Sequence, residues 1–133
     1  MDHIDDCEIE CWMVGSPQKR QKLEETLKQI KALFRNRNIS PEYICKALEF
    51  VCEHPDDYSC LQCYNKITGD YDTSTCASAC ESSHRRSFCF LIKDIHLNII
   101  AEEKNKMVII TFHILSEEKD FRKKCNYRFI NLT

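Results

Sequence analysis

Four cysteines with short, regular spacing stand near the middle of the chain. Two residues separate Cys60 from Cys63 and three separate Cys76 from Cys80, with twelve residues between the two pairs. Side chains four positions apart are neighbours on a helix, so we expect Cys76 and Cys80 to share one helical face. Four thiolates at about 2.3 Å from a tetrahedral ion form a closed structural zinc site. The spacing therefore predicts one Zn²⁺ held by these four sulfurs.

Other potential ligands surround this cluster. His84 follows Cys80 by one helical turn and can substitute for a cysteine, while Cys52, His54 and Cys89 can compete for the metal. The chain has ten cysteines. Two alternatives to zinc therefore stay open, namely unpaired thiols in the core and a framework of disulfides.

The first sixteen residues bear on the cellular compartment. They carry five acidic side chains and no basic one, whereas a signal peptide begins with basic residues and continues with an apolar run. No stretch approaches the roughly 18 apolar residues of a membrane helix. We therefore expect an intracellular protein, cytoplasmic or nuclear, that does not enter a membrane. In a reducing compartment the thiols stay free or bind metal.

Composition excludes several classes of enzyme. Gly15 and Gly69 are the only glycines, which rules out the glycine-rich loops that hold phosphates and a Gly-x-Ser-x-Gly nucleophile elbow. No feature of the sequence marks one cysteine as an activated nucleophile. We expect a protein that is not an enzyme.

Apolar periodicity predicts an α+β fold. Ser16-Pro17 begins a helix whose apolar face runs from Leu23 to Phe34, and Ser40-Pro41 begins a second. After Arg86 the period changes to the alternation of strands, first over 90–99 and then over 108–114, with a short third strand at 127–130. The expected fold has two N-terminal helices, a small zinc-knuckle segment, and a C-terminal antiparallel hairpin or three-stranded sheet.

We expect the chain to divide into an N-terminal arm and one domain. Residues 1–16 form an acidic N-terminal arm, and residues 17–133 form a single zinc-stabilised domain. Within that domain we place the helices in 17–54, the metal cluster in 55–89 and the sheet in 88–131.

The first predicted helix is amphipathic and basic. Residues 17–37 carry seven basic and two acidic side chains, although the whole chain has a net charge of −2. A basic helix face can contact phosphates or an acidic partner, or it can simply be solvated. The candidate contacts are Lys19, Arg20, Lys22, Lys28, Lys31, Arg35, Arg85 and Arg86, with Trp12 and Tyr64 as aromatic anchors.

Two further patterns concern modification and metal binding. Asn38-Ile39-Ser40 and Asn131-Leu132-Thr133 match the N-glycosylation pattern, and Pro41 follows the first. His96 and His113 fall on the polar side of the predicted hairpin. They lie directly opposite each other if the turn spans residues 103–106, which allows either a metal or pH-sensing role or two exposed imidazoles.

The small size, many cysteines, few glycines and acidic opening resemble those of small cysteine-rich accessory proteins of viruses. Some plant-virus members of that group suppress RNA silencing. The resemblance covers no motif beyond the Cys60–Cys80 cluster, so it assigns no role to a residue. We expect a zinc-binding regulatory protein that binds a partner protein, and the resemblance implies a viral protein that counters host defence. The alternative is an RNA-binding suppressor of silencing that uses helix 17–37.

Overall fold

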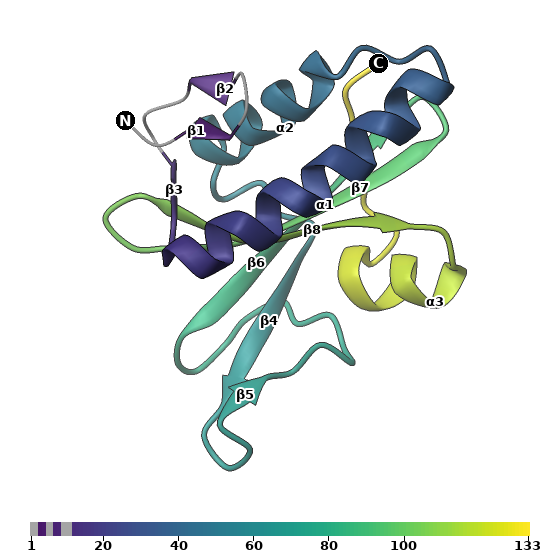
Figure 1. The fold of residues 1–133 in the computed structure, drawn as a ribbon. Helices are drawn as coiled ribbons and strands as arrows, with labels where there is room; N and C mark the ends of the chain where they lie inside the picture. The colour runs from purple at the N-terminus through teal and green to yellow at the C-terminus, as the bar shows by residue number, and fades with distance from the viewer. Residues whose placement is uncertain (1–2, 5–6, 9–11) are drawn as a thin grey trace.

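The computed structural model describes residues 3–4, 7–8 and 12–133. Three α-helices, one π-helical segment and nine strands are found in this part of the chain (Figure 1). In chain order they are β1 (His3–Ile4), β2 (Cys7–Glu8), β3 (Trp12–Val14), α1 (Pro17–Asn36), α2 (Glu42–Glu53), β4 (Cys60–Asn65), β5 (Asp70–Tyr71), β6 (His84–Ile92), β7 (Ile95–Glu103), β8 (Met107–Leu115), the short α3 (Glu118–Asp120) with the π-helical segment η1 (Phe121–Cys125) that continues it, and β9 (Ile130–Asn131).

Helix α1 begins as its sequence predicts. The Ser16 hydroxyl accepts a hydrogen bond from the Lys19 backbone N–H at 3.3 Å, and Pro17 occupies the first turn, where a missing N–H has no cost. Its buried side chains recur every three or four residues and are Leu23, Leu27, Ile30 and Phe34. That apolar face packs against the sheet, which leaves the basic face in water.

Helix α2 follows the same logic over a shorter length. Ile44, Ala47, Leu48 and Val51 are buried along one side. The Ser40 hydroxyl accepts a hydrogen bond from the Glu42 backbone N–H at 3.3 Å, which satisfies one free donor at the start of the helix.

The main sheet has the strand order β3-β8-β7-β6-β4-β5. The long strands β6, β7 and β8 pair antiparallel, and β4 continues the antiparallel order by pairing with the first half of β6. The second half of β6 pairs with β9 instead, in parallel, and β3 pairs in parallel with β8. In the described part of the chain seven strands thus belong to this sheet.

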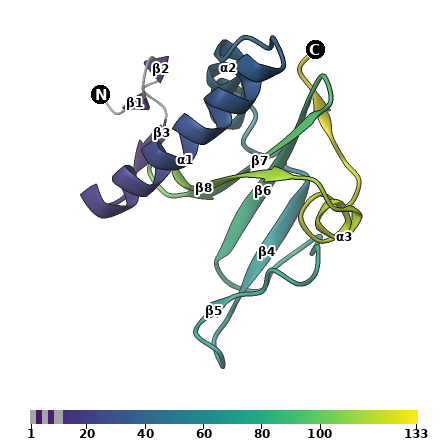
Figure 2. The same ribbon diagram turned by 45° about the vertical axis from the view of Figure 1, so that its right-hand side comes forward.

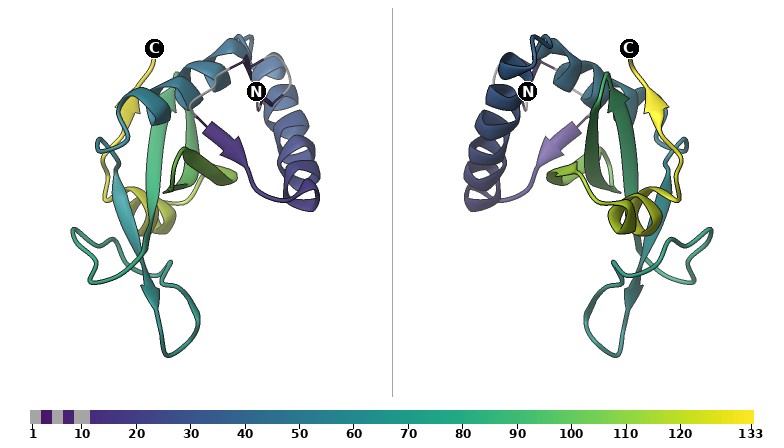
Figure 3. Two further views of the ribbon diagram at one scale, coloured as in Figure 1. Left: turned by 90° about the vertical axis from the view of Figure 1, so that its left-hand side faces the viewer. Right: turned by 90° about the vertical axis from the view of Figure 1, so that its right-hand side faces the viewer.

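Different elements cover the two faces of the sheet (Figure 2). Helices α1 and α2 cover one face and enclose the main core, which includes Phe34, Phe88, Phe90 and Phe112. Segment η1 covers part of the other face, where Cys89, Leu115 and Cys125 are buried beside Phe121 and Phe129. The hairpin β4–β5 projects away from both layers (Figures 1 and 3).

The structure confirms the α+β class and corrects its details. The sheet is larger than a hairpin or three strands, because Cys60–Asn65 and His84–Ser87 also form strands and pair with each other. The predicted strand over 90–99 is interrupted by a turn at Lys93, whose φ is 55°. The expected helix carrying Cys76 and Cys80 is absent, since residues 75–83 have no helical turn. No zinc knuckle is found among the described residues.

No helix in the described part of the chain combines the length and the apolar character needed to cross a bilayer.

Candidate functional site

The projecting hairpin is built from a short stem and an ordered tip. Tyr64 pairs with Tyr71 and Asn65 with Asp70 in the stem. At the tip the Asn65 side-chain oxygen accepts hydrogen bonds from the backbone N–H groups of Ile67 at 2.8 Å and Thr68 at 3.3 Å. Gly69 has a φ of 72°, a conformation that favours glycine. The turn is therefore closed by its own residues.

Two disulfides fasten this hairpin to the segment that follows it. Cys60 is bonded to Cys76 and Cys63 to Cys80, with Cα–Cα distances of 5.3 Å and 5.4 Å. Backbone hydrogen bonds between Leu61 and Ala77, in both directions, reinforce the link. The hairpin and residues 72–83 thus form one cross-linked unit, which we call the hairpin unit (residues 60–83).

The tip exposes an apolar side chain. Ile67 is 95% exposed, and Tyr127, at 50%, is the only other exposed large apolar side chain among those whose exposure the structure describes. The Tyr64 and Tyr71 rings meet edge to face at the stem, with centroids 5.3 Å apart. Beside them lies an open hollow of about 570 Å³, whose lining includes Lys66, Ile67, Asp72 and Glu81.

Hydrogen bonds from a nearby serine stabilise the Asp72 carboxylate in the lining of this hollow. Asp72 accepts hydrogen bonds from the Ser74 hydroxyl at 2.6 Å and from the Ser74 backbone N–H at 2.8 Å. These bonds favour the carboxylate and lower the pKa of Asp72 below its ordinary value. Asp72 thus contributes a carboxylate to the same hollow that Ile67 lines.

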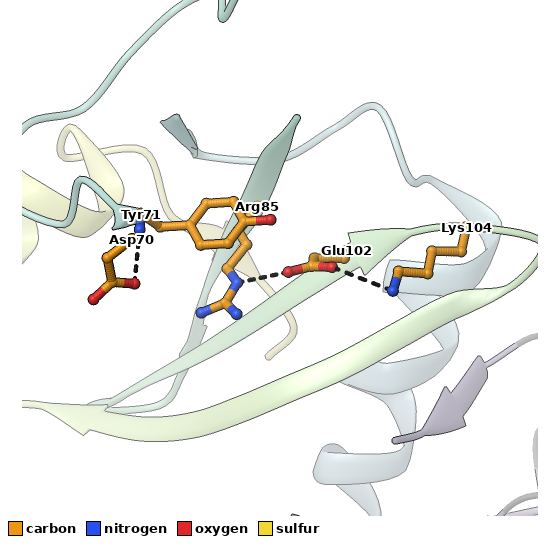
Figure 4. A network of polar contacts seen from close by, with 5 residues as sticks. All are labelled: Asp70, Tyr71, Arg85, Glu102 and Lys104. Atoms are coloured by element: carbon orange, nitrogen blue, oxygen red, sulfur yellow. Dashed lines mark hydrogen bonds and ion pairs between the residues drawn. The ribbon is translucent and has the colours of Figure 1, made fainter. Parts of the chain in front are cut away.

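A cation fixes the base of the hairpin to the sheet (Figure 4). The Arg85 guanidinium lies over the Tyr71 ring, 4.1 Å from its centroid, and its Nε donates to Glu102 Oε1 at 2.7 Å. Lys104 Nζ lies 4.0 Å from Glu102 Oε2. The contact joins β5, β6 and β7, and so it limits movement of the stem relative to the sheet.

Arg86 is buried and engaged inside the molecule. Its guanidinium donates to Glu103 Oε2 at 2.6 Å and to the Pro55 carbonyl at 3.0 Å, and it lies 3.6 Å from Asp56. Arg85 and Arg86 thus both have structural partners in the described part of the chain, and any contact that they make with another molecule stays a prediction.

The predicted zinc site is wrong. Cys60 and Cys63 lie on strand β4, where residues an odd number apart point to opposite faces, so their sulfurs cannot converge on one ion. Cys60 is buried and pairs with Cys76, whereas Cys63 is half-buried and pairs with Cys80. His84 pairs in register with Cys63 but belongs to β6. No group of His, Cys, Asp and Glu side chains suited to a metal ion occurs among the described residues.

Disulfides also reach the rest of the fold. Cys7 is bonded to Cys45 and Cys89 to Cys125, and Cys52 is disulfide-bonded as well. None of the described cysteines is a free thiol. Such bonds form and persist in oxidising surroundings and are rare in the cytosol or nucleus. The expected intracellular location is therefore wrong, and an extracellular or secreted setting fits instead.

The predicted contacts on α1 lie along its outer side. Lys19, Lys22, Lys28 and Arg35 are exposed, and Arg20 and Lys31 are half-buried. Burial and the nearby Arg35 lower the pKa of Lys31. Glu24 and Glu25 are also exposed on this helix, so the surface is not purely basic. Contact with RNA or a partner through these residues stays a prediction.

The two predicted aromatic anchors fall in different places. Tyr64 lies in the stem of the hairpin unit, close to the exposed tip. The Trp12 backbone pairs with Met107 of β8, while its side chain lies outside the described part of the structure.

The two histidines of the sheet are not opposed. His113 pairs with Asn98, and His96 pairs with Leu115, because the turn is placed differently and the register shifts at Ile100–Ala101. Both imidazoles are half-buried on the face covered by η1, not freely exposed. Within the described part of the chain they form no metal-binding group.

Sequence reasoning missed the exposed tip. Ile67 is not among the contact residues predicted from the sequence. The signal was available in the run Tyr64-Asn65-Lys66-Ile67-Thr68-Gly69-Asp70-Tyr71, where asparagine and glycine between two tyrosines indicate a hairpin.

Comparison of the chain with protein-family models, with curated proteins and with solved structures finds no match. The fold and site define a disulfide-stabilised α+β domain, and its function must be argued from its surface.

Proposed function

We propose that this protein is a non-enzymatic, extracellular binding domain that captures a partner protein with the tip of its β4–β5 hairpin. The observation that carries the proposal is the 95% exposure of Ile67 at the end of a projecting hairpin. Burying a large aliphatic side chain is worth about 1.5–3 kcal/mol, so its full exposure leaves that energy for association.

The hairpin is organised before it meets a partner. The Asn65 side chain, the backbone conformation of Gly69 and the Cys63–Cys80 bond hold the tip in one shape. Ordering a flexible loop during association costs free energy, and a loop that is already ordered avoids most of that cost. A rigid apolar tip is thus suited to insertion into a preformed pocket.

Charge around the tip indicates the chemistry of the partner. Within the hairpin unit Asp70, Asp72 and Glu81 are exposed, and Lys66 is the one basic residue of that unit. Complementary potentials favour association and exclude wrong partners. The expected partner surface has an apolar pocket at its centre and basic side chains at its rim.

RNA binding by the basic face of α1 is the less favoured function. Its support is the exposure of Lys19, Lys22, Lys28 and Arg35. Suppression of RNA silencing takes place inside cells, where disulfides such as those of this fold are rare.

The proposal is tested by substitution at the tip. A photo-crosslinking amino acid at position 67 first identifies the partner among secreted and cell-surface proteins, and affinity is then measured by calorimetry. We expect Ile67→Asp to weaken binding roughly 30-fold, which corresponds to about 2 kcal/mol for a central interface residue. The fold should persist, because Ile67 is outside every core cluster of the described residues.

Tyr127 provides the matched control. Among the side chains that the structure describes it is the other exposed large apolar one, and it follows η1 in the chain. Its φ of 56° is tolerated by asparagine, so Tyr127→Asn should fold and bind as the original protein does. Equal affinities for Ile67→Asp and the original protein would contradict the proposal, as would an equal loss in both variants.

A further inference from the structure

We infer that Asn131 is an N-glycosylation site and that its glycan occupies the end of the molecule opposite the hairpin unit. This inference does not depend on the proposed function. It rests on the Asn131-Leu132-Thr133 pattern, on the geometry of these residues and on the disulfides of the fold.

The oxidising setting supplies the first condition. Eukaryotic N-glycosylation and disulfide formation both occur in the secretory pathway, so a disulfide-bonded chain is exposed to the glycosylating machinery. Without the disulfides the pattern alone has little weight, because a triplet of this kind often occurs by chance.

The local geometry of Asn131 supplies the second condition. Asn131 and Thr133 are exposed. The Asn131 side-chain oxygen accepts hydrogen bonds from the Thr133 hydroxyl at 3.2 Å and from its backbone N–H at 3.0 Å. The amide nitrogen Nδ2 has no hydrogen-bond partner among the described residues. Attachment of a glycan at this atom therefore breaks no hydrogen bond between the described residues.

The residues of the Asn38-Ile39-Ser40 pattern are placed less favourably for a glycan. Its middle residue, Ile39, is buried in the main core at 3% exposure. The Ser40 hydroxyl accepts a hydrogen bond at the start of α2, and Pro41 follows it directly. Asn38 itself is exposed but has a φ of 56°, which fixes it in a tight turn. We therefore assign the glycan to Asn131.

The position of Asn131 leaves the hairpin unit uncovered. The Thr133 hydroxyl accepts a hydrogen bond from the Lys93 backbone N–H at 3.1 Å, which places the C-terminal residues at the turn between β6 and β7. In Figures 1 and 3 this end of the molecule lies far from β5. A glycan is bulky and solubilising, so it would cover the β6–β7 end while the Ile67 tip remains accessible.

The reaction uses an oligosaccharide linked to a lipid pyrophosphate as the donor. A bond forms between Asn131 Nδ2 and the anomeric carbon of the first sugar. The bond between that carbon and the phosphate oxygen breaks, the lipid pyrophosphate leaves with the electron pair, and the amide nitrogen loses one proton.

The test is secretion of the 133-residue chain from a eukaryotic host, with any purification tag at the N-terminus. Intact mass is measured before and after enzymatic removal of N-glycans, a treatment that converts a glycosylated asparagine to aspartate. We expect one glycan on the original protein, with the aspartate found at position 131 by peptide mapping. Asn131→Gln and Thr133→Ala should each abolish the glycan.

Two matched variants exclude a general effect on secretion. Thr133→Ser keeps the hydroxyl that the pattern requires, and should keep the glycan. Asn38→Gln removes the other pattern and should also keep it. A secreted, disulfide-bonded original protein without glycan would overturn the inference, and so would a glycan that persists in Asn131→Gln.

Discussion

Histidine burial against aromatic rings is the clearest residue-scale feature outside the hairpin unit. The His96 ring lies 4.4 Å from the Phe121 ring and 4.7 Å from that of Phe129, measured between centroids. Burial lowers the pKa of His96, opposed by Asp94. Burial and Lys124 lower the pKa of His113, opposed by Asp120. The fold therefore favours both imidazoles in the neutral form.

These two histidines should make stability depend on pH. Their folded-state pKa values lie below the ordinary value of 6.5, so the unfolded chain binds more protons than the folded one. The stabilisation that the two histidines contribute to the fold is complete above pH 6.5, their ordinary pKa. This stabilisation decreases as pH falls through 6.5. No further stability is lost once pH is below both folded-state pKa values.

The measurement is urea unfolding with the disulfides intact, at pH of about 7.5, 6.5 and 5. We expect stability to fall across this series, and His96→Gln with His113→Gln to flatten the decline. If the free energy of unfolding depends on pH in the double variant as it does in the original protein, groups other than these histidines cause the decline.

Disulfides connect the elements in separate places. Cys7–Cys45 joins β2 to α2, and Cys89–Cys125 joins β6 to η1 on the opposite face of the sheet. Cys60–Cys76 and Cys63–Cys80 lie within the hairpin unit. Removal of single bonds should therefore separate the stability of the domain from the order of the hairpin unit.

Replacement of Cys63 and Cys80 by alanine should weaken partner binding about tenfold, because the segment 72–83 no longer braces the tip and its ordering must occur on association. The matched control is Cys7→Ala with Cys45→Ala. We expect this control to lose about 2–4 kcal/mol of stability yet keep its affinity. Calorimetry measures both quantities, and equal affinities in the two double variants would show that the hairpin needs no brace.

At the scale of the whole molecule, disulfides stabilise the fold where a metal was expected. Helices on one face and η1 on the other enclose two apolar clusters, and the bonds cross-link both. A chelator should therefore have no effect on the folded protein, whereas a reductant should lower its melting temperature.

Loss of a native disulfide from a small secreted domain costs roughly 2–5 kcal/mol, and several are lost together on reduction. We expect a large fall in melting temperature with a thiol reductant and none with a chelator of divalent metals. Circular dichroism monitors both titrations, and intact mass without reductant verifies the bonds. Unfolding by the chelator alone would restore the case for a structural metal.

The sequence by itself determined the features that depend on local order. Ser16-Pro17 and the stripe from Leu23 to Phe34 predict α1 and its buried face, because helix capping and helical periodicity act within a few residues. Alternation along 108–114 predicts β8 for the same reason, since successive side chains of a strand point to opposite faces.

Tertiary structure alone decided what the cysteines and the tip do. A spacing of two residues brings sulfurs together only if the backbone turns, and pairing of β4 with β6 keeps Cys60 and Cys63 extended and apart. Strand register likewise depends on where the turn and bulge fall, which moved His113 opposite Asn98. Ile67 is exposed because its hairpin projects away from the helices and from the rest of the sheet, and that arrangement is set by contacts between distant segments.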